Sequence, residues 1–131
     1  MITLYSINRS ETLILPNELI WVDEIQWSNV KANLQYSIEG DMIIEYSQTS
    51  KGRPITLQGD NALIKREDVL TLYNWVNEIN HIMELTLHDN RKFDVVFRYW
   101  EEPLEAKVPF EGYSKPEDGN YYTLTLRMLQ I

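Results

Sequence analysis

Apolar and polar residues alternate with a period of two along most of this chain. Every second residue of Val30–Ile38 is apolar, and a second apolar-rich run, Met42–Tyr46, follows Glu39–Asp41. Because successive side chains of a strand point to opposite faces, this alternation predicts half-buried strands. The glycine and the two acids between the runs are typical of a turn, so we expect a hairpin with one face in the core.

Further alternating segments predict a larger sheet. Met83–His88 and Phe93–Arg98 flank Asp89-Asn90, which predicts a second hairpin, and Tyr122–Met128 predicts a closing strand inside the sheet. Shorter candidate strands are Thr3–Ile7, Thr12–Leu15, Leu19–Val22 and Ile55–Gln58. We therefore expect a sheet of about seven or more strands in a mainly β fold, either a β-barrel or a β-sandwich.

One segment follows a helical period instead. Between Glu67 and Asn80 the apolar residues are spaced by three and four: Val69, Leu72, Tyr73, Val76 and Ile79. This spacing predicts one amphipathic helix over 67–80 that packs on the sheet. Glu67 and Asp68 would lie in its first turn, where the helix dipole favours carboxylates.

The segment from Tyr99 to Asn120 shows no period and contains three prolines and two glycines. A loop of about twenty residues in a small domain is uncommon and often functional. Because it also carries large apolar side chains, we expect a long irregular arm that packs on its own domain or on a neighbouring subunit. The residues expected at a subunit contact are Trp100, Val108, Phe110 and Tyr113.

The composition of the chain excludes several classes of protein function. The 131 residues predict a single domain, 1–131, and 20 acidic against 12 basic residues give a net charge of −8. This charge argues against specific nucleic-acid binding and against an electrostatic membrane anchor. The absence of cysteine excludes disulfides and Cys-ligated metals. We expect no membrane span and no signal peptide, because the apolar runs are short and the N-terminus lacks a basic start.

The residues usually used in catalysis form no recognisable motif. We expect His81 and His88 to be surface or capping residues on opposite faces, too far apart to share a metal. No nucleophile elbow, phosphate loop or calcium loop is present, and neighbouring acids such as Glu101-Glu102 are typical of solvated charge. The sequence thus predicts no enzyme, no cofactor and no metal, although a hydrolase using two carboxylates stays open as a weaker alternative.

The four tryptophans and eight tyrosines leave another alternative open. Aromatic side chains stack on sugars as well as on bases, but a nucleic-acid site would have Lys and Arg among them. Here acids follow Trp21 and Trp100. Packing in a core or in a subunit interface is the favoured interpretation. A β-barrel module that binds a small molecule or a carbohydrate is the alternative.

The order of several segments resembles a known family. The stretch Gly-Arg-Pro-Ile-Thr-Leu-Gln-Gly at 52–59 is followed by the helix, by a hairpin over 85–97 with the tip Asn-Arg-Lys-Phe, and by the closing Tyr-Tyr-Thr-Leu-Thr-Leu at 121–126. Over about residues 30–131 the chain resembles the small β-barrel proteins of bacteriophage tails, the tail tube, distal tail and baseplate-hub family.

The resemblance implies a structural subunit of the virion, made in the host cytoplasm. Members of that family join side by side into rings, as a rule hexameric, and their long loops reach neighbouring tail or baseplate proteins. An acidic lumen lets DNA pass without binding. The family has no catalytic residues, so none are carried over. The chain departs from the multidomain distal tail proteins because it lacks a second domain, so its position along the tail stays open.

Overall fold

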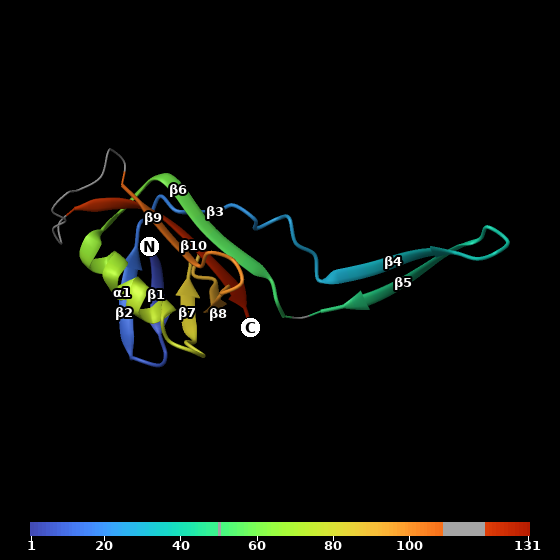
Figure 1. Ribbon diagram of the computed structural model, residues 1–131, viewed down its shortest axis with the longest axis horizontal. Helices are drawn as coiled ribbons and strands as arrows, with labels where there is room; N and C mark the ends of the chain where they lie inside the picture. The colour runs from blue at the N-terminus through green and yellow to red at the C-terminus, as the bar shows by residue number, and fades with distance from the viewer. Residues whose placement is uncertain (50, 109–119) are drawn as a thin grey trace.

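The fold consists of one eight-stranded sheet, one helix and a separate two-stranded hairpin (Figure 1). This computed structural model describes residues 1–49, 51–108 and 120–131. The strands of the main sheet are β1 (Ile2–Ser6), β2 (Glu11–Leu15), β3 (Ile20–Trp21), β6 (Pro54–Lys65), β7 (Met83–Thr86), β8 (Lys92–Phe97), β9 (Leu104–Lys107) and β10 (Tyr121–Gln130). The hairpin consists of β4 (Val30–Tyr36) and β5 (Met42–Gln48), and the helix is α1 (Arg66–Val76).

The main sheet is antiparallel and open. Its strands follow the order β2-β1-β7-β8-β10-β6-β3, and β9 pairs with the first half of β10 beside β8. The two long strands β6 and β10 pair over most of their length, with an irregularity between Thr123 and Leu124. The strands at the two ends of this order, β2 and β3, do not pair with each other in the described residues, so the sheet is open and does not close into a barrel. The prediction of a mainly β fold with a single packed helix is confirmed.

Alternating residues of the main sheet build the core. In β1 the side chains of Ile2, Leu4 and Ser6 are buried, whereas Tyr5 is exposed. Figure 1 shows β6 and β10 crossing over the strands β1 and β7, so the buried faces of the curved sheet enclose one cluster. Trp75 of α1 is fully buried in that cluster. The expected hairpin after Met83 is also confirmed, with Asn90 at a positive φ of 65° in its turn.

The helix is shorter than predicted. Leu72 and Trp75 are buried, while Tyr73 and Ile79 of the predicted stripe are exposed. The amide of Asn77 still bonds to the carbonyl of Tyr73, but Asn80 adopts a positive φ of 58°, which a right-handed helix does not allow. The part of the prediction that continued the helix to residue 80 is therefore wrong. The acidic first turn is confirmed.

The predicted irregular arm is in part a strand. Leu104–Lys107 forms β9 and pairs with β10. Leu-Glu-Ala-Lys does alternate, but a run of four residues between prolines is too short to predict a strand by its pattern alone. Trp100 is 69% exposed and Val108 is half-buried. Phe110 and Tyr113 lie outside the described residues. Residues 109–119 of the expected arm thus lie outside the described part of the chain, and the contact expected for the arm stays a prediction.

Among the described residues, the element that projects from the body is the β4–β5 hairpin. It extends away from the body of the molecule, and Figure 1 shows it reached by two single connecting segments. The hairpin pairing is as predicted, but every residue of β4 and β5 is exposed, so the expectation of a half-buried face is wrong. The physical reason is topological: no other described strand or helix lies against this two-stranded sheet.

Candidate functional site

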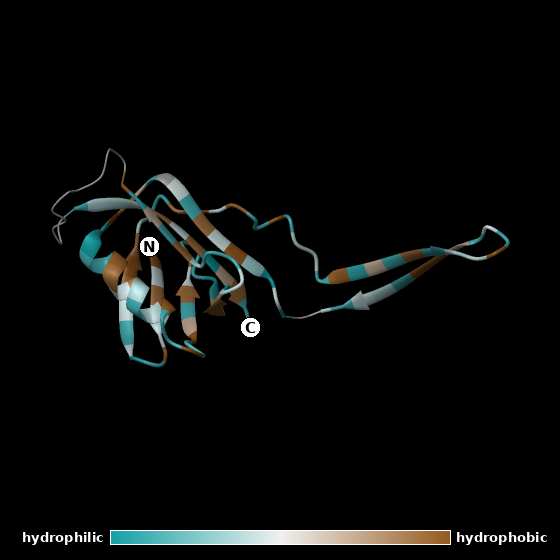
Figure 2. Ribbon diagram, viewed as in Figure 1, coloured by the Kyte–Doolittle hydropathy of each residue, from teal (hydrophilic) through white to brown (hydrophobic). Residues whose placement is uncertain are grey.

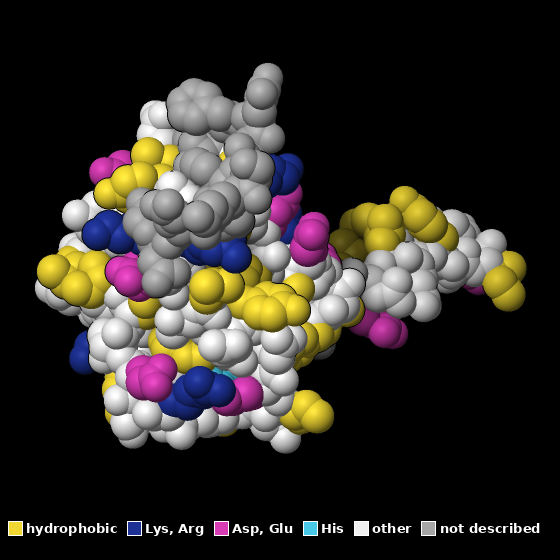
Figure 3. Space-filling model, turned by 60° about the vertical axis from the view of Figure 1, so that its left-hand side comes forward, with side chains coloured by type: hydrophobic (Ala, Val, Ile, Leu, Met, Phe, Trp, Pro, Cys, Tyr) yellow, Lys and Arg dark blue, Asp and Glu magenta, His cyan; other side chains and the backbone are white. Residues whose placement is uncertain are grey.

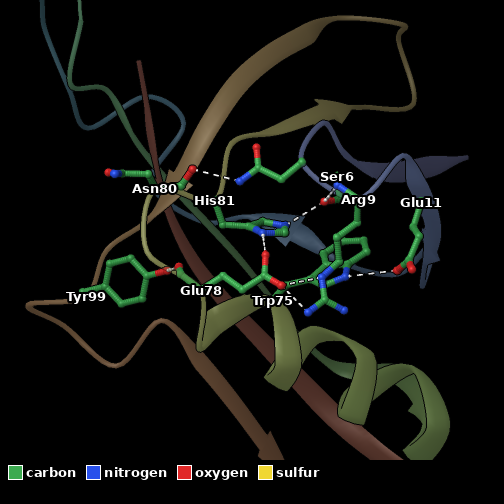
Figure 4. Close-up of polar contacts among 9 residues, drawn as sticks. Ser6, Arg9, Glu11, Trp75, Glu78, Asn80, His81 and Tyr99 are labelled. Atoms are coloured by element: carbon green, nitrogen blue, oxygen red, sulfur yellow. Dashed lines mark hydrogen bonds and ion pairs between the residues drawn. The ribbon is translucent and has the colours of Figure 1, made fainter.

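A serine, a histidine and a glutamate form a chain of hydrogen bonds at one end of the sheet (Figure 4). The Oγ atom of Ser6 lies 2.8 Å from Nε2 of His81, and Nδ1 of His81 lies 2.7 Å from Oε2 of Glu78. Ser6 ends β1, whereas Glu78 and His81 lie between α1 and β7. The arrangement has the order of a Ser-His-acid triad.

The partners of Ser6 and Glu78 assign the protons. Ser6 Oγ accepts the backbone N–H of Arg9 at 3.2 Å, and its hydroxyl can donate to Nε2 of His81. His81 then carries its proton on Nδ1 and donates it to Glu78. Arg9 also forms an ion pair with Glu78, and the Arg9 hydrogen bond, followed by that of His81, lowers the pKa of the Glu78 carboxyl.

Burial closes this cluster to substrates. Ser6 is 0% exposed and His81 is 1% exposed. The ring of His81 lies between Trp75, at a centroid distance of 5.5 Å, and Phe97, at 6.5 Å, in stacked geometry. A serine nucleophile needs an open approach for the scissile carbonyl. The cluster is therefore structural: its hydrogen bonds connect the β1–β2 turn to the segment after α1.

His81 corrects the sequence-based expectation for the histidines. It is a core residue with two hydrogen-bond partners, whereas the exposed His88 is a surface residue as expected. Ser6 and His81 are 75 positions apart, so no local motif could have revealed their contact. The surrounding segment is held further by Tyr99, whose hydroxyl donates to the carbonyl of Glu78 at 2.7 Å, and by Asn8, which donates to the carbonyl of Asn80.

A shallow cavity of about 190 Å³ lies beside Trp21. The guanidinium groups of Arg53 and Arg91 lie 4.4 Å and 5.5 Å from the Trp21 ring centre. Arg91 is also paired with Asp89 and Glu24. Sites for small ligands usually span about 300–1,000 Å³, and this cavity is smaller than that. Two open hollows, of about 390 Å³ beside Trp27 and about 410 Å³ beside Tyr99, reach that size, so the small-molecule or carbohydrate alternative stays open. The two arginines come from distant segments, which is why sequence neighbours of Trp21 did not reveal them.

The β4–β5 hairpin is strongly amphipathic. The cross-strand pairs 30–48, 32–46, 34–44 and 36–42 share one face because paired residues point to the same side of a sheet. Seven of these eight residues are apolar: Val30, Ala32, Leu34, Tyr36, Met42, Ile44 and Tyr46, with Gln48 as the eighth. We call this set the apolar face. The opposite face carries Lys31, Asn33, Gln35, Ile43, Glu45 and Ser47.

The apolar face is fully open in the described part of the chain. Tyr36, Met42 and Tyr46 are 68%, 61% and 70% exposed. Figure 2 shows the alternation of brown and teal bands along β4, and Figure 3 shows hydrophobic side chains gathered on the hairpin. Monomeric proteins rarely expose contiguous apolar patches of this kind, which usually mark interaction sites.

A small polar network fixes the base of the hairpin. The backbone N–H and the hydroxyl of Thr56 both donate to the carboxylate of Asp23, at 2.9 Å and 2.8 Å. Arg53 donates to the carbonyl of Glu24 at 2.7 Å. Gly52, at a φ of 94°, donates its N–H to the carbonyl of Gln130. These contacts clamp both connecting segments to the main sheet, so the exposed hairpin leaves the body from a fixed base.

The molecule offers little else that points to chemistry. Within residues 1–49, 51–108 and 120–131, no group of three or more His, Asp or Glu side chains could hold a metal ion. In the same described residues no helix is long and apolar enough to cross a membrane. Comparisons with models of protein families, with curated proteins and with solved structures give no match. The candidate functional site is therefore the β4–β5 hairpin, which sequence alternation found but assigned to the core.

Proposed function

We propose that this chain is a structural subunit of a bacteriophage tail, in the tail tube, the distal tail or the baseplate hub, and that it assembles into a ring around a central channel. The observation that carries the proposal is the exposed apolar face of the β4–β5 hairpin. A subunit that stays alone leaves these side chains in water, whereas a subunit in an assembly buries them.

The charge and the fold support the same proposal. The body is small and mainly β with one helix, as the resemblance implies, although its sheet is open where the family has a barrel. A net charge of −8, repeated around a ring, would repel DNA in transit and prevent it from sticking to the wall. The partners are then further copies of this chain, in a ring that is hexameric as a rule in that family, and neighbouring tail or baseplate proteins.

The closed Ser6–His81–Glu78 cluster adds no catalytic role to this function. Its serine is buried, and its hydrogen bonds are all used within the fold. The proposal therefore needs no substrate, cofactor or metal. The work of the protein is assembly, with apolar burial as the driving force and ordering of the contacting groups as the main cost.

Electron microscopy and light scattering of the purified full chain test the proposal. We expect rings with a central channel for the natural sequence. A variant in which residues 25–51 are replaced by a short Gly-Ser linker keeps the Asp23–Thr56 contact, and we expect it to stay a folded monomer. A natural chain that stays monomeric at high concentration would overturn the proposal. Mass spectrometry of purified phage particles should find the chain in the virion.

A further inference from the structure

The β4–β5 hairpin has two free sheet edges of seven residues each within the described structure. Ser37 donates its N–H to the carbonyl of Asp41, and Thr49 donates to that of Asn29, both at 2.8 Å. In an antiparallel pair, hydrogen-bonded and non-hydrogen-bonded residue pairs alternate. The odd-numbered residues of β4 and β5 therefore bond within the hairpin, and the even-numbered residues direct their N–H and C=O groups outward.

The outward backbone groups belong to the residues of the apolar face. Residues 30, 32, 34 and 36 on β4, and 42, 44, 46 and 48 on β5, combine free backbone groups with exposed side chains. Native edge strands are usually protected by proline, bulges, inward charges or shortness. Neither strand contains proline or glycine, the register has no bulge, and each carries a single charge. Both edges are thus suited to receive another strand.

The one charged residue on each strand favours one pairing between copies over the others. Lys31 is the charged residue of β4, and Glu45 is that of β5. If two β5 strands paired antiparallel over their full length, Glu45 would lie directly opposite its own copy, which is destabilising. If two β4 strands paired, both β5 edges would stay open. Pairing of β4 with the β5 of a second copy places Lys31 diagonal to Glu45 and uses both edges of every copy.

We infer that β4 of one copy pairs edge to edge with β5 of the next copy, so that the hairpins form one continuous antiparallel sheet across the ring. Even-numbered residues then face even-numbered residues, and the apolar faces of all copies lie on the same side of this sheet. The contact is heterologous, as closure of a ring requires. The inference rests on the proposed self-assembly and names the surface that carries it.

Single cysteines test this pairing, because the natural chain has none. In the expected register, Asn33 of one copy lies opposite Glu45 of the next in a non-hydrogen-bonded pair, where Cβ atoms are close enough for a disulfide. We expect Asn33→Cys and Glu45→Cys proteins to form a disulfide-linked dimer when they are co-assembled and oxidised. Each variant alone should stay unlinked. Lys31→Cys and Gln35→Cys detect the same pairing in a register shifted by two residues.

Samples that contain only one cysteine variant distinguish β4–β5 pairing from β5–β5 and β4–β4 pairing. Self-linking of Glu45→Cys would indicate that β5 pairs with β5, and self-linking of Asn33→Cys would indicate that β4 pairs with β4; either result overturns the inference. Rings that form without any link between β4 and β5 would also overturn it, while the proposed function would stand. A natural chain that forms no ring and no cross-link would overturn both.

A proline on the free edge provides a second measurement. The N–H of Ala32 points outward, so Ala32→Pro blocks strand addition and leaves the hydrogen bonds of the hairpin intact. Ala32→Thr changes the same side chain but keeps the N–H. We expect loss of rings and of cross-links for the proline variant only, with unchanged circular dichroism of the body. Assembly of both variants would contradict the inference.

Discussion

The body and the hairpin of this protein show the same alternation and opposite burial. In β1, Ile2 and Leu4 lie in the core, whereas Leu34 and Tyr36 in the equally regular β4 lie in solvent. The difference is what covers each apolar face. The apolar face of β1 is covered by β6, β10 and α1, whereas no element of the described chain covers that of β4 in its two-stranded sheet. Alternation therefore identifies residues that share a face, but not the partner that buries it.

The largest effect expected from this comparison is at Trp75. Trp75→Ala empties a fully buried site in the body and should lower the free energy of unfolding by about 3–5 kcal/mol. Tyr36→Ala, on the apolar face, should change the stability of the isolated subunit by less than about 0.5 kcal/mol. Urea denaturation of monomeric protein measures both. Equal losses would mean that the hairpin is covered in the subunit as well.

The second largest loss of stability is expected in the buried polar cluster of Ser6, His81 and Glu78. Ser6→Ala leaves Nε2 of His81 and the N–H of Arg9 without their partner in a closed site, which should cost about 1–3 kcal/mol. Ser28→Ala is the matched change near the hairpin, because Ser28 bonds only to the exposed amide of Val30 among the contacts described, and its effect on the body should be small. Thermal unfolding compares the two. An unchanged melting temperature for Ser6→Ala would show that the cluster does not stabilise the fold.

A substitution at a closely packed glycine should have an effect of similar size. A Cβ at Gly59 would lie 2.8 Å from the carbonyl oxygen of Glu18 and 3.1 Å from Cβ of Ala62. Gly59→Ala should therefore destabilise the body by about 1–3 kcal/mol through overpacking. Gly40→Ala meets nothing within 4 Å at the hairpin tip, where only its positive φ opposes the change, so body stability should be unaffected. Unfolding followed by tryptophan fluorescence distinguishes them, and a tolerant Gly59 would argue against the close approach.

The smallest effect is a pH dependence at Glu78. Arg9 and then His81 lower the pKa of this carboxyl below its ordinary value of 4.5. A group whose folded pKa is lowered adds stability above its unfolded pKa, and the stability is lost as the pH falls through the folded pKa. The melting-temperature difference between the natural chain and Glu78→Gln should be visible at pH 7 and shrink below pH about 4.5. A difference that is constant with pH would assign the effect to packing.

Much of the body could be predicted from local pattern. The strands around Met83–Phe97 and Tyr122–Met128 alternate clearly, and Glu67-Asp68 indicates the start of the helix. The end of the helix could not be predicted, because Ile79 fits a helical stripe, and the left-handed backbone of Asn80 is not visible in sequence. The strand Leu104–Lys107 was missed because its partner, β10, lies far along the chain.

The candidate site could be predicted only in part. The hairpin and its two faces follow from residues 30–46, but their exposure depends on which elements lie nearby in three dimensions. Trp100 and Val108 were expected at a subunit contact, which stays a prediction, whereas the pattern gave no sign that the hairpin would project from the body. The contact of Ser6 with His81 joins residues 75 positions apart, and no composition or spacing rule links them.

The length of the β4–β5 hairpin can change without any change in the body, because of where the chain enters and leaves the hairpin. β3 and β6 pair with each other at Trp21–Leu57, where the segments that connect to the hairpin leave the body, and the N–H of Val22 bonds to the carbonyl of Thr56. The chain thus leaves and re-enters the body at adjacent points, whatever lies between them. Adding two residues to each strand would lengthen the ribbon by about 7 Å and keep every side chain on its face. The hairpin can therefore serve as a molecular ruler. Evolution or design can change its length by two residues per strand at a time, and the core of the body does not have to repack.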